Sequence, residues 1–111
     1  MKLIDVWVNC PDTECAHRIA DALITERLVA CSNLFSRIDS CFRWKEKTER
    51  EEEYPLLLKT RAENFDVLAE RVEELHPYET PSVIGIRVEH VNDEYLKWVY
   101  EETKDFTKTS T

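Results

Sequence analysis

Two prolines set four residues apart, Pro77 and Pro81, constrain the folding of this chain more than any other feature of its sequence. A proline fixes its own φ angle and disfavours the α-helical conformation in the residue before it, which here affects His76 and Thr80. A helix that reaches this point must therefore stop, and the chain must continue in an extended direction. Residues 75–81, which we call the elbow, are predicted to join a helical run to a strand-like run.

The elbow also carries three side chains with chemical capability: the imidazole of His76, the phenol of Tyr78 and the carboxylate of Glu79. These groups can donate or accept hydrogen bonds, and they can bind a metal ion. One interpretation is a structural turn in which Tyr78 packs and His76 caps the end of a helix. The other interpretation is a binding site held on a rigid backbone.

Composition limits the classes of protein to which the chain can belong. Its 111 residues suit one domain, and its net charge of −8 argues against a nucleic-acid partner. No apolar run approaches the ~20 residues of a membrane span, and the first residues lack a signal-peptide pattern, so we expect a cytoplasmic protein with no membrane partner. The four cysteines are then expected to be reduced thiols. The single glycine, Gly85, excludes a glycine-rich phosphate loop.

The hydrophobic pattern alternates between period two and helical spacing along the chain. Period-two runs predict strands over residues 3–8 and 29–44, and short apolar runs predict strands over residues 54–59 and 83–88. Helical spacing predicts helices that follow an N-cap at Asp12, a capping box from Thr60 to Glu63, and an N-cap at Asn92. Residues 45–53 are almost all charged and are predicted to form an exposed loop.

This order of elements is the split βαβ pattern of ferredoxin-like α+β folds, βαββαβ with an added C-terminal helix. We predict a single domain over residues 1–103, with the helices on one face of an antiparallel sheet, and a polar tail over residues 104–111 that frays. The opposite face would expose apolar side chains and is expected to meet another copy of the chain. Those side chains are Leu3, Trp7, Phe35 and Val83.

The strands over residues 29–44 and 54–59 are predicted to form a hairpin with an arm longer than a small sheet needs. Phe42, Trp44 and Tyr54 lie near its far end. A two-stranded arm is marginally stable alone, so these aromatic side chains are predicted to form the interface with other copies of the chain.

Five short motifs occur in the order and spacing of a known family. They are Cys10-Pro11-Asp12, ERLVACSN at 26–33, Leu58-Lys59-Thr60, His76-Pro77-Tyr78-Glu79 followed by Pro81, and Tyr95-Leu96-Lys97-Trp98. Together they resemble the CutA family of divalent-cation tolerance proteins over about residues 3–103. The resemblance implies a ferredoxin-like homotrimer, associated with tolerance of copper and other divalent ions and with Cu(II) binding. We expect no cofactor to be required for folding.

The chain departs from the family pattern where copper binding is concerned. The Cys, His and Glu positions linked with copper in bacterial members fall on residues that do not suit Cu(II), namely Val8, Leu75 and Ser82. In a split βαβ sheet the elbow lies beside the end of the first strand, so we predict a shifted site for Cu(II) or another divalent metal, formed by Cys10, His76 and Glu79. The alternative is a buried Cys10 and a helix-ending His76 that bind no ligand.

Two further departures lie outside the predicted site. Many members have Tyr and then Gly in the arm where this chain has Phe42 and Glu46, and a Pro near the end of the last strand where it has Arg87. The fold is expected to survive these changes.

We considered three functions. An enzyme is disfavoured because the histidines and cysteines are scattered and no local nucleophile signature is present. A homotrimer that binds divalent metal ions is what the resemblance to CutA implies. The alternative is a signalling trimer similar in architecture to nitrogen-regulatory proteins, with an anionic metabolite between subunits, although the acidic charge counts against it.

Overall fold

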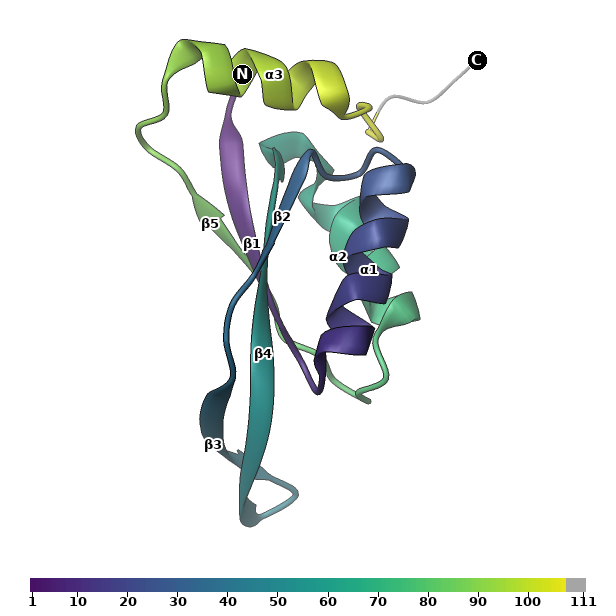
Figure 1. Ribbon diagram of the computed structural model, residues 1–111, viewed down its shortest axis with the longest axis vertical. Helices are drawn as coiled ribbons and strands as arrows, with labels where there is room; N and C mark the ends of the chain where they lie inside the picture. The colour runs from purple at the N-terminus through teal and green to yellow at the C-terminus, as the bar shows by residue number, and fades with distance from the viewer. Residues whose placement is uncertain (108–111) are drawn as a thin grey trace.

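The computed structural model of the chain describes residues 1–107, which form one antiparallel sheet with three α-helices (Figure 1). The elements are β1 (Leu3–Cys10), α1 (Thr13–Thr25), β2 (Cys31–Leu34), β3 (Ile38–Trp44), β4 (Lys47–Arg61), a 3-10 turn (Ala62–Asn64), α2 (Phe65–Leu75), β5 (Val83–Arg87) and α3 (Asp93–Glu102).

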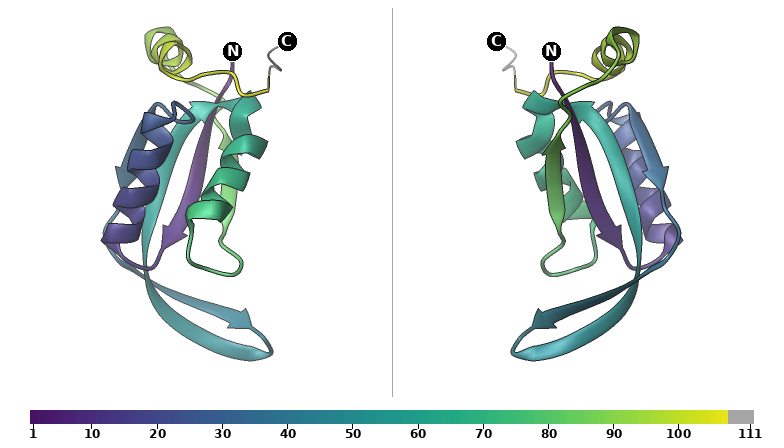
Figure 2. Two further views of the ribbon diagram at one scale, coloured as in Figure 1. Left: turned by 90° about the vertical axis from the view of Figure 1, so that its right-hand side faces the viewer. Right: turned by 90° about the vertical axis from the view of Figure 1, so that its left-hand side faces the viewer.

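The strands of the sheet lie in the order β2-β4-β1-β5, and every neighbouring pair is antiparallel. Both α1 and α2 cover the same face of this sheet (Figure 2), whereas α3 lies across one end of it (Figure 1). The predicted ferredoxin-like split βαβ fold is therefore confirmed. We call the face opposite α1 and α2 the open face.

The core lies between the sheet and these two helices. Alternation along β1 turns Ile4, Val6 and Val8 toward the helices, where all three are buried. The side chains that meet them from α1 and α2 include Ile19, Leu23, Leu68 and Val72. The start of α1 is set by Asp12, because its Oδ1 accepts the backbone N–H of Cys15 at 2.8 Å, as predicted for an N-cap.

The hairpin differs from the sequence prediction. The predicted strand over residues 29–44 is two strands, β2 and β3, separated by residues 35–37, and the charged run predicted as a loop belongs to β4. Only Lys45 and Glu46 form the turn, both with positive φ angles of 48° and 69°. The charged residues can form a strand because β3 and the first half of β4 pair only with each other beyond the sheet, so their side chains stay in water (Figure 1). We call this two-stranded part, residues 38–53, the arm.

The predicted capping box at Thr60 is wrong. Thr60 lies in β4, paired with Ile4, and its Oγ1 donates to the backbone oxygen of Leu28 at 2.6 Å. Its hydroxyl is occupied by Leu28 and therefore does not cap a helix, and α2 begins only at Phe65.

The chain after α3 makes hydrogen bonds to the rest of the fold as far as residue 106. The backbone N–H of Lys104 donates to Arg27, and Asn64 donates to Lys104 O at 2.6 Å and accepts from Phe106 N–H at 3.0 Å. Phe106 packs against the core. Residues 108–111 of the predicted tail lie outside the described residues.

The open face is apolar, as predicted, but its composition differs. Trp7 and Phe35 meet edge to face with ring centroids 5.1 Å apart. Val83 instead pairs with Val8 and packs against the core, while Leu3 is only 3% exposed. The side chains of β5 on the open face are Ile84 and Ile86, 55% and 48% exposed.

None of the helices within residues 1–107 is long and apolar enough to cross a membrane.

Candidate functional site

The elbow begins where the prolines require the helix to stop. Leu75 is the last residue of α2, and His76 adopts an extended conformation with φ −84° and ψ 138°. The backbone N–H of His76 still donates to Val72 O at 2.8 Å. The carbonyl oxygen of Leu75 accepts a hydrogen bond from Arg18 of α1 at 3.1 Å, which fixes the end of α2 against the neighbouring helix.

The imidazole of His76 is buried, and both of its nitrogens have partners. Its Nε2 lies 2.8 Å from Asn9 O; a carbonyl oxygen only accepts, so Nε2 carries the proton. Nδ1 then accepts the backbone N–H of Tyr78 at 3.2 Å. Burial lowers the pKa of His76 below its usual value, which favours this neutral ring. His76 thus bridges β1 and the elbow, and its ring has no nitrogen free for a ligand.

A carboxylate that the sequence analysis placed in a loop lies under the elbow. Glu53 is only 7% exposed, and its Oε2 accepts the phenolic O–H of Tyr78 at 3.0 Å. Burial and then Glu53 raise the pKa of Tyr78, so the phenol keeps its proton. The sequence contained a signal that Glu53 is buried, because Glu53 continues the period-two series of Pro55 and Leu57, which are both buried in β4.

Cys10 is fully buried at the end of β1. The next cysteine along the chain, Cys15, lies in the first turn of α1 and is also buried. Burial, followed by the effects of Cys15, raises the pKa of Cys10 to about 12, so Cys10 is a neutral thiol at physiological pH.

Glu79 is an exposed residue that is paired with the arm. Its carboxylate is 70% exposed and pairs with Lys45 at the tip of the arm, with an Nζ–Oε2 distance of 3.4 Å. The structure therefore does not bring Cys10, His76 and Glu79 into one coordination sphere. Within residues 1–107, no group of three or more His, Cys, Asp or Glu side chains is placed to hold a metal ion.

The three aromatic residues predicted for the interface occupy two environments. Phe42 and Trp44 lie on β3 and are 41% and 37% exposed. Lys45 lies over the Trp44 ring, with its Nζ 5.5 Å from the ring centroid. Tyr54 is half-buried at the base of the arm, where it pairs with Cys10 of β1.

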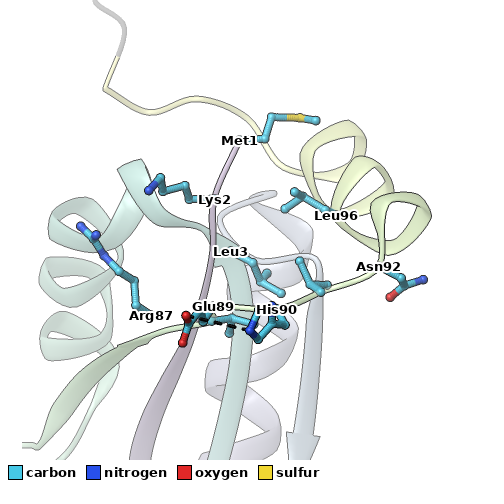
Figure 3. Close-up of a pocket in the computed structure, with 10 residues that line it drawn as sticks. Met1, Lys2, Leu3, Arg87, Glu89, His90, Asn92 and Leu96 are labelled. Atoms are coloured by element: carbon cyan, nitrogen blue, oxygen red, sulfur yellow. Dashed lines mark ion pairs between the residues drawn. The ribbon is translucent and has the colours of Figure 1, made fainter.

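A concave region, separate from the elbow, lies between the start of β1, the end of β5 and the loop before α3 (Figure 3). Its volume is about 830 Å³, and its lining includes Lys2, Arg87 and His90. Glu89 approaches His90 Nε2 at 3.9 Å, and both side chains are highly exposed. The sequence analysis assigned none of these residues to a site.

The sequence of the chain is similar to those of known proteins from one family. Residues 4–102 match the profile of the CutA1 divalent ion tolerance protein family. The chain is 46% identical over 103 residues to the divalent-cation tolerance protein CutA of Pyrococcus horikoshii, which covers 92% of this chain and 99% of that protein. It is 38% identical over 105 residues to mouse protein CutA, covering 95% of this chain and 59% of the longer mouse protein.

The fold agrees with that of a solved relative. The crystal structure of CutA1 from Oryza sativa superposes with a TM-score of 0.90 at 34% sequence identity, covering 95% of this chain and 96% of the rice chain. The profile match, the identities and this superposition extend over nearly the whole chain, and the chain belongs to the CutA1 divalent ion tolerance protein family.

Proposed function

We propose that this divalent-cation tolerance protein acts as a cytoplasmic homotrimer that binds divalent metal ions, copper among them, and catalyses no reaction. The observation that carries the assembly is the set of large apolar side chains left exposed on the open face and the arm. They are Phe35, Ile38, Phe42, Trp44, Ile84 and Ile86.

The large accessible surface of the chain supports the proposed assembly. The chain has 7378 Å² of accessible surface, whereas a compact monomer of its mass would have about 6,400 Å². The arm accounts for an extended shape, since it projects beyond the sheet (Figure 1). Edge strands β2 and β5 also leave backbone groups available for pairing. The number of copies, three, comes from the resemblance to CutA.

The metal-binding part of the proposal requires ligands from more than one copy. Both ring nitrogens of His76 are hydrogen-bonded, and the thiol of Cys10 is buried and protonated. Glu79 is the accessible member of the three predicted ligands, and it lies beside the tip of the arm. We propose that divalent ions bind at Glu79 together with side chains of a neighbouring copy.

Light scattering after size exclusion tests the assembly. Trp44 is 37% exposed. Burying this exposed part of a side chain whose total area is about 250 Å² stabilises the assembly by about 2 kcal/mol per chain. Trp44→Ala should therefore shift the particle toward monomer at low micromolar concentration. Trp98→Ala is the matched control, because Trp98 is 40% exposed but lies on α3, outside the arm. Equal effects of both variants, or none, would contradict the proposed interface.

Calorimetric titration with Cu(II), Zn(II) and Ni(II) tests the metal site separately. The wild type should bind, and Glu79→Gln should bind more weakly while the particle mass stays the same. The His76→Gln variant should retain the affinity of the wild type, since His76 is assigned a structural role. Undiminished affinity in Glu79→Gln would exclude Glu79 as a ligand.

The concave region in Figure 3 favours a second candidate function, a trimer that binds a small anionic molecule. Lys2 and Arg87 contribute positive charge to its lining. Arg87→Gln should then abolish the binding of anionic metabolites without changing Cu(II) affinity. Failure of wild-type protein to bind any anion in a metabolite screen would remove this candidate.

A further inference from the structure

The concave region of Figure 3 has two chemically different ends. The side chains of Lys2 and Arg87 extend to one side of β1, whereas Leu96 of α3 lies on the other side (Figure 3). Further apolar residues of the lining include Val88 and Val91. The region therefore offers positive charge and apolar surface to the same ligand.

The two cations have no counter-ion in the fold. Within residues 1–107, the side chains of Lys2 and Arg87 form no ion pair and no hydrogen bond. Elsewhere in the same sheet, Lys59 is paired with Asp5, with an Nζ–Oδ1 distance of 3.6 Å. A guanidinium without a partner keeps its planar fork of N–H donors available, and this fork matches a carboxylate.

Hydrogen bonds hold the cations and the apolar wall in place. Arg87 ends β5, and the ladder between β1 and β5 continues with one more bond, from Val88 N–H to Leu3 O at 3.1 Å. The hydroxyl of Tyr100 in α3 accepts Lys2 N–H at 2.8 Å, which ties the start of β1 to that helix. The lining is therefore formed before a ligand binds, which lowers the cost of binding.

We propose that the concave region binds an amphipathic monocarboxylate, with its carboxylate between Lys2 and Arg87 and its apolar chain against Leu96. This inference rests on the second candidate function and names the class of anion. The volume of about 830 Å³ suits a ligand of medium size. Because the cations and Leu96 lie on opposite sides of β1, only an elongated ligand reaches both (Figure 3).

The charges around the region favour one negative charge on the ligand over several. Glu89 belongs to the lining, and Asp93 and Glu94 occupy the first turn of α3. These carboxylates partly offset the two cations, so a second negative charge on the ligand would meet repulsion as well as attraction. Nucleotides and other polyphosphates are therefore disfavoured.

Calorimetric titration of the full chain with acetate, butanoate, hexanoate and octanoate tests the proposal. Each buried methylene group should raise the affinity by about 4-fold. Octylamine and 1-octanol carry the same chain as octanoate without its negative charge, and they should bind at least about 10-fold more weakly. Octyl phosphate, a dianion at pH 8, should bind no more tightly than octanoate.

Variants locate the two ends of the site. Arg87→Gln should weaken octanoate binding at least about 10-fold, since a charge-assisted hydrogen bond is lost. Lys97→Gln is the matched control and should bind like the wild type, because Lys97 is an exposed cation of α3 outside the lining. Leu96→Ala should reduce the gain per methylene group and leave the affinity for acetate unchanged. Circular dichroism of all three variants should match the wild type.

Three results would overturn the proposal. They are an affinity that does not change with chain length, octanoate binding that is undiminished in Arg87→Gln, and octylamine binding as tight as that of octanoate. If acetate and octanoate bound equally and Arg87→Gln removed both, the anion-binding function would stand and the amphipathic ligand would be excluded. If the wild type bound no anion at all, both would be excluded.

Discussion

The buried contact between Tyr78 and Glu53 gives a sharp test of how the elbow is held. Tyr78→Phe removes the hydroxyl that donates to Glu53 Oε2 at 3.0 Å but keeps the aromatic ring, whose centroid lies 4.6 Å from that of His76. A hydrogen bond to a charged group contributes roughly 1.5–3 kcal/mol. Glu53 is only 7% exposed, so water cannot replace the lost donor and we expect a loss of about 2–3 kcal/mol.

The assay is chemical unfolding at one fixed subunit concentration, because the stability of an assembling protein depends on concentration. Tyr100→Phe is the matched control: its hydroxyl contacts Glu63 Oε2 at 3.2 Å and the backbone N–H and carbonyl oxygen of Lys2, but all of these contacts are exposed. We expect the free energy of unfolding to fall less in this control. In the cycle with Glu53→Gln, the double variant should be more stable than the sum of the single losses predicts. Equal losses in Tyr78→Phe and Tyr100→Phe would refute the reasoning.

Three further predictions concern the turn of the arm, the buried histidine and the single glycine. Glu46→Gly should raise the free energy of unfolding by about 1 kcal/mol in chemical denaturation, because glycine adopts the observed φ of 69° without strain. Burial lowers the pKa of His76 in the folded chain, so the unfolded chain binds a proton more readily and stability should fall as pH drops below about 6.5. In thermal melts, the melting temperature should depend less on pH in His76→Gln than in the wild type, and an unchanged pH dependence would contradict this assignment. Gly85→Ala would place a Cβ 2.8 Å from Phe65 Cδ1 and should lower the free energy of unfolding by about 1–3 kcal/mol. Adding Phe65→Leu should restore part of this stability, and no restoration would count against the clash.

Much of the fold followed from local patterns. Period-two alternation predicted β1, an apolar run predicted β5, and the cap at Asp12 predicted the start of α1, because each signal lies within a few neighbouring residues. The length of β4 could not be predicted in the same way. Its first half is charged because the arm leaves the sheet and keeps those side chains in water, a consequence of tertiary structure.

The site was less predictable than the fold. The topology correctly places the elbow beside the end of β1, where His76 reaches Asn9 O. The direction of a side chain at an elbow depends on its partners, however, and Glu79 turns toward Lys45 on the arm. The buried position of Glu53 likewise depends on Tyr78, which lies 25 residues away in sequence.

The central claim is that the exposed apolar side chains of the open face and the arm are covered by other copies of the chain. The most direct measurement is the mass of the wild-type particle by light scattering during size exclusion at low micromolar concentration. The account predicts a single species of three times the 13.2 kDa chain mass. A monodisperse particle of 13.2 kDa under the same conditions would contradict it.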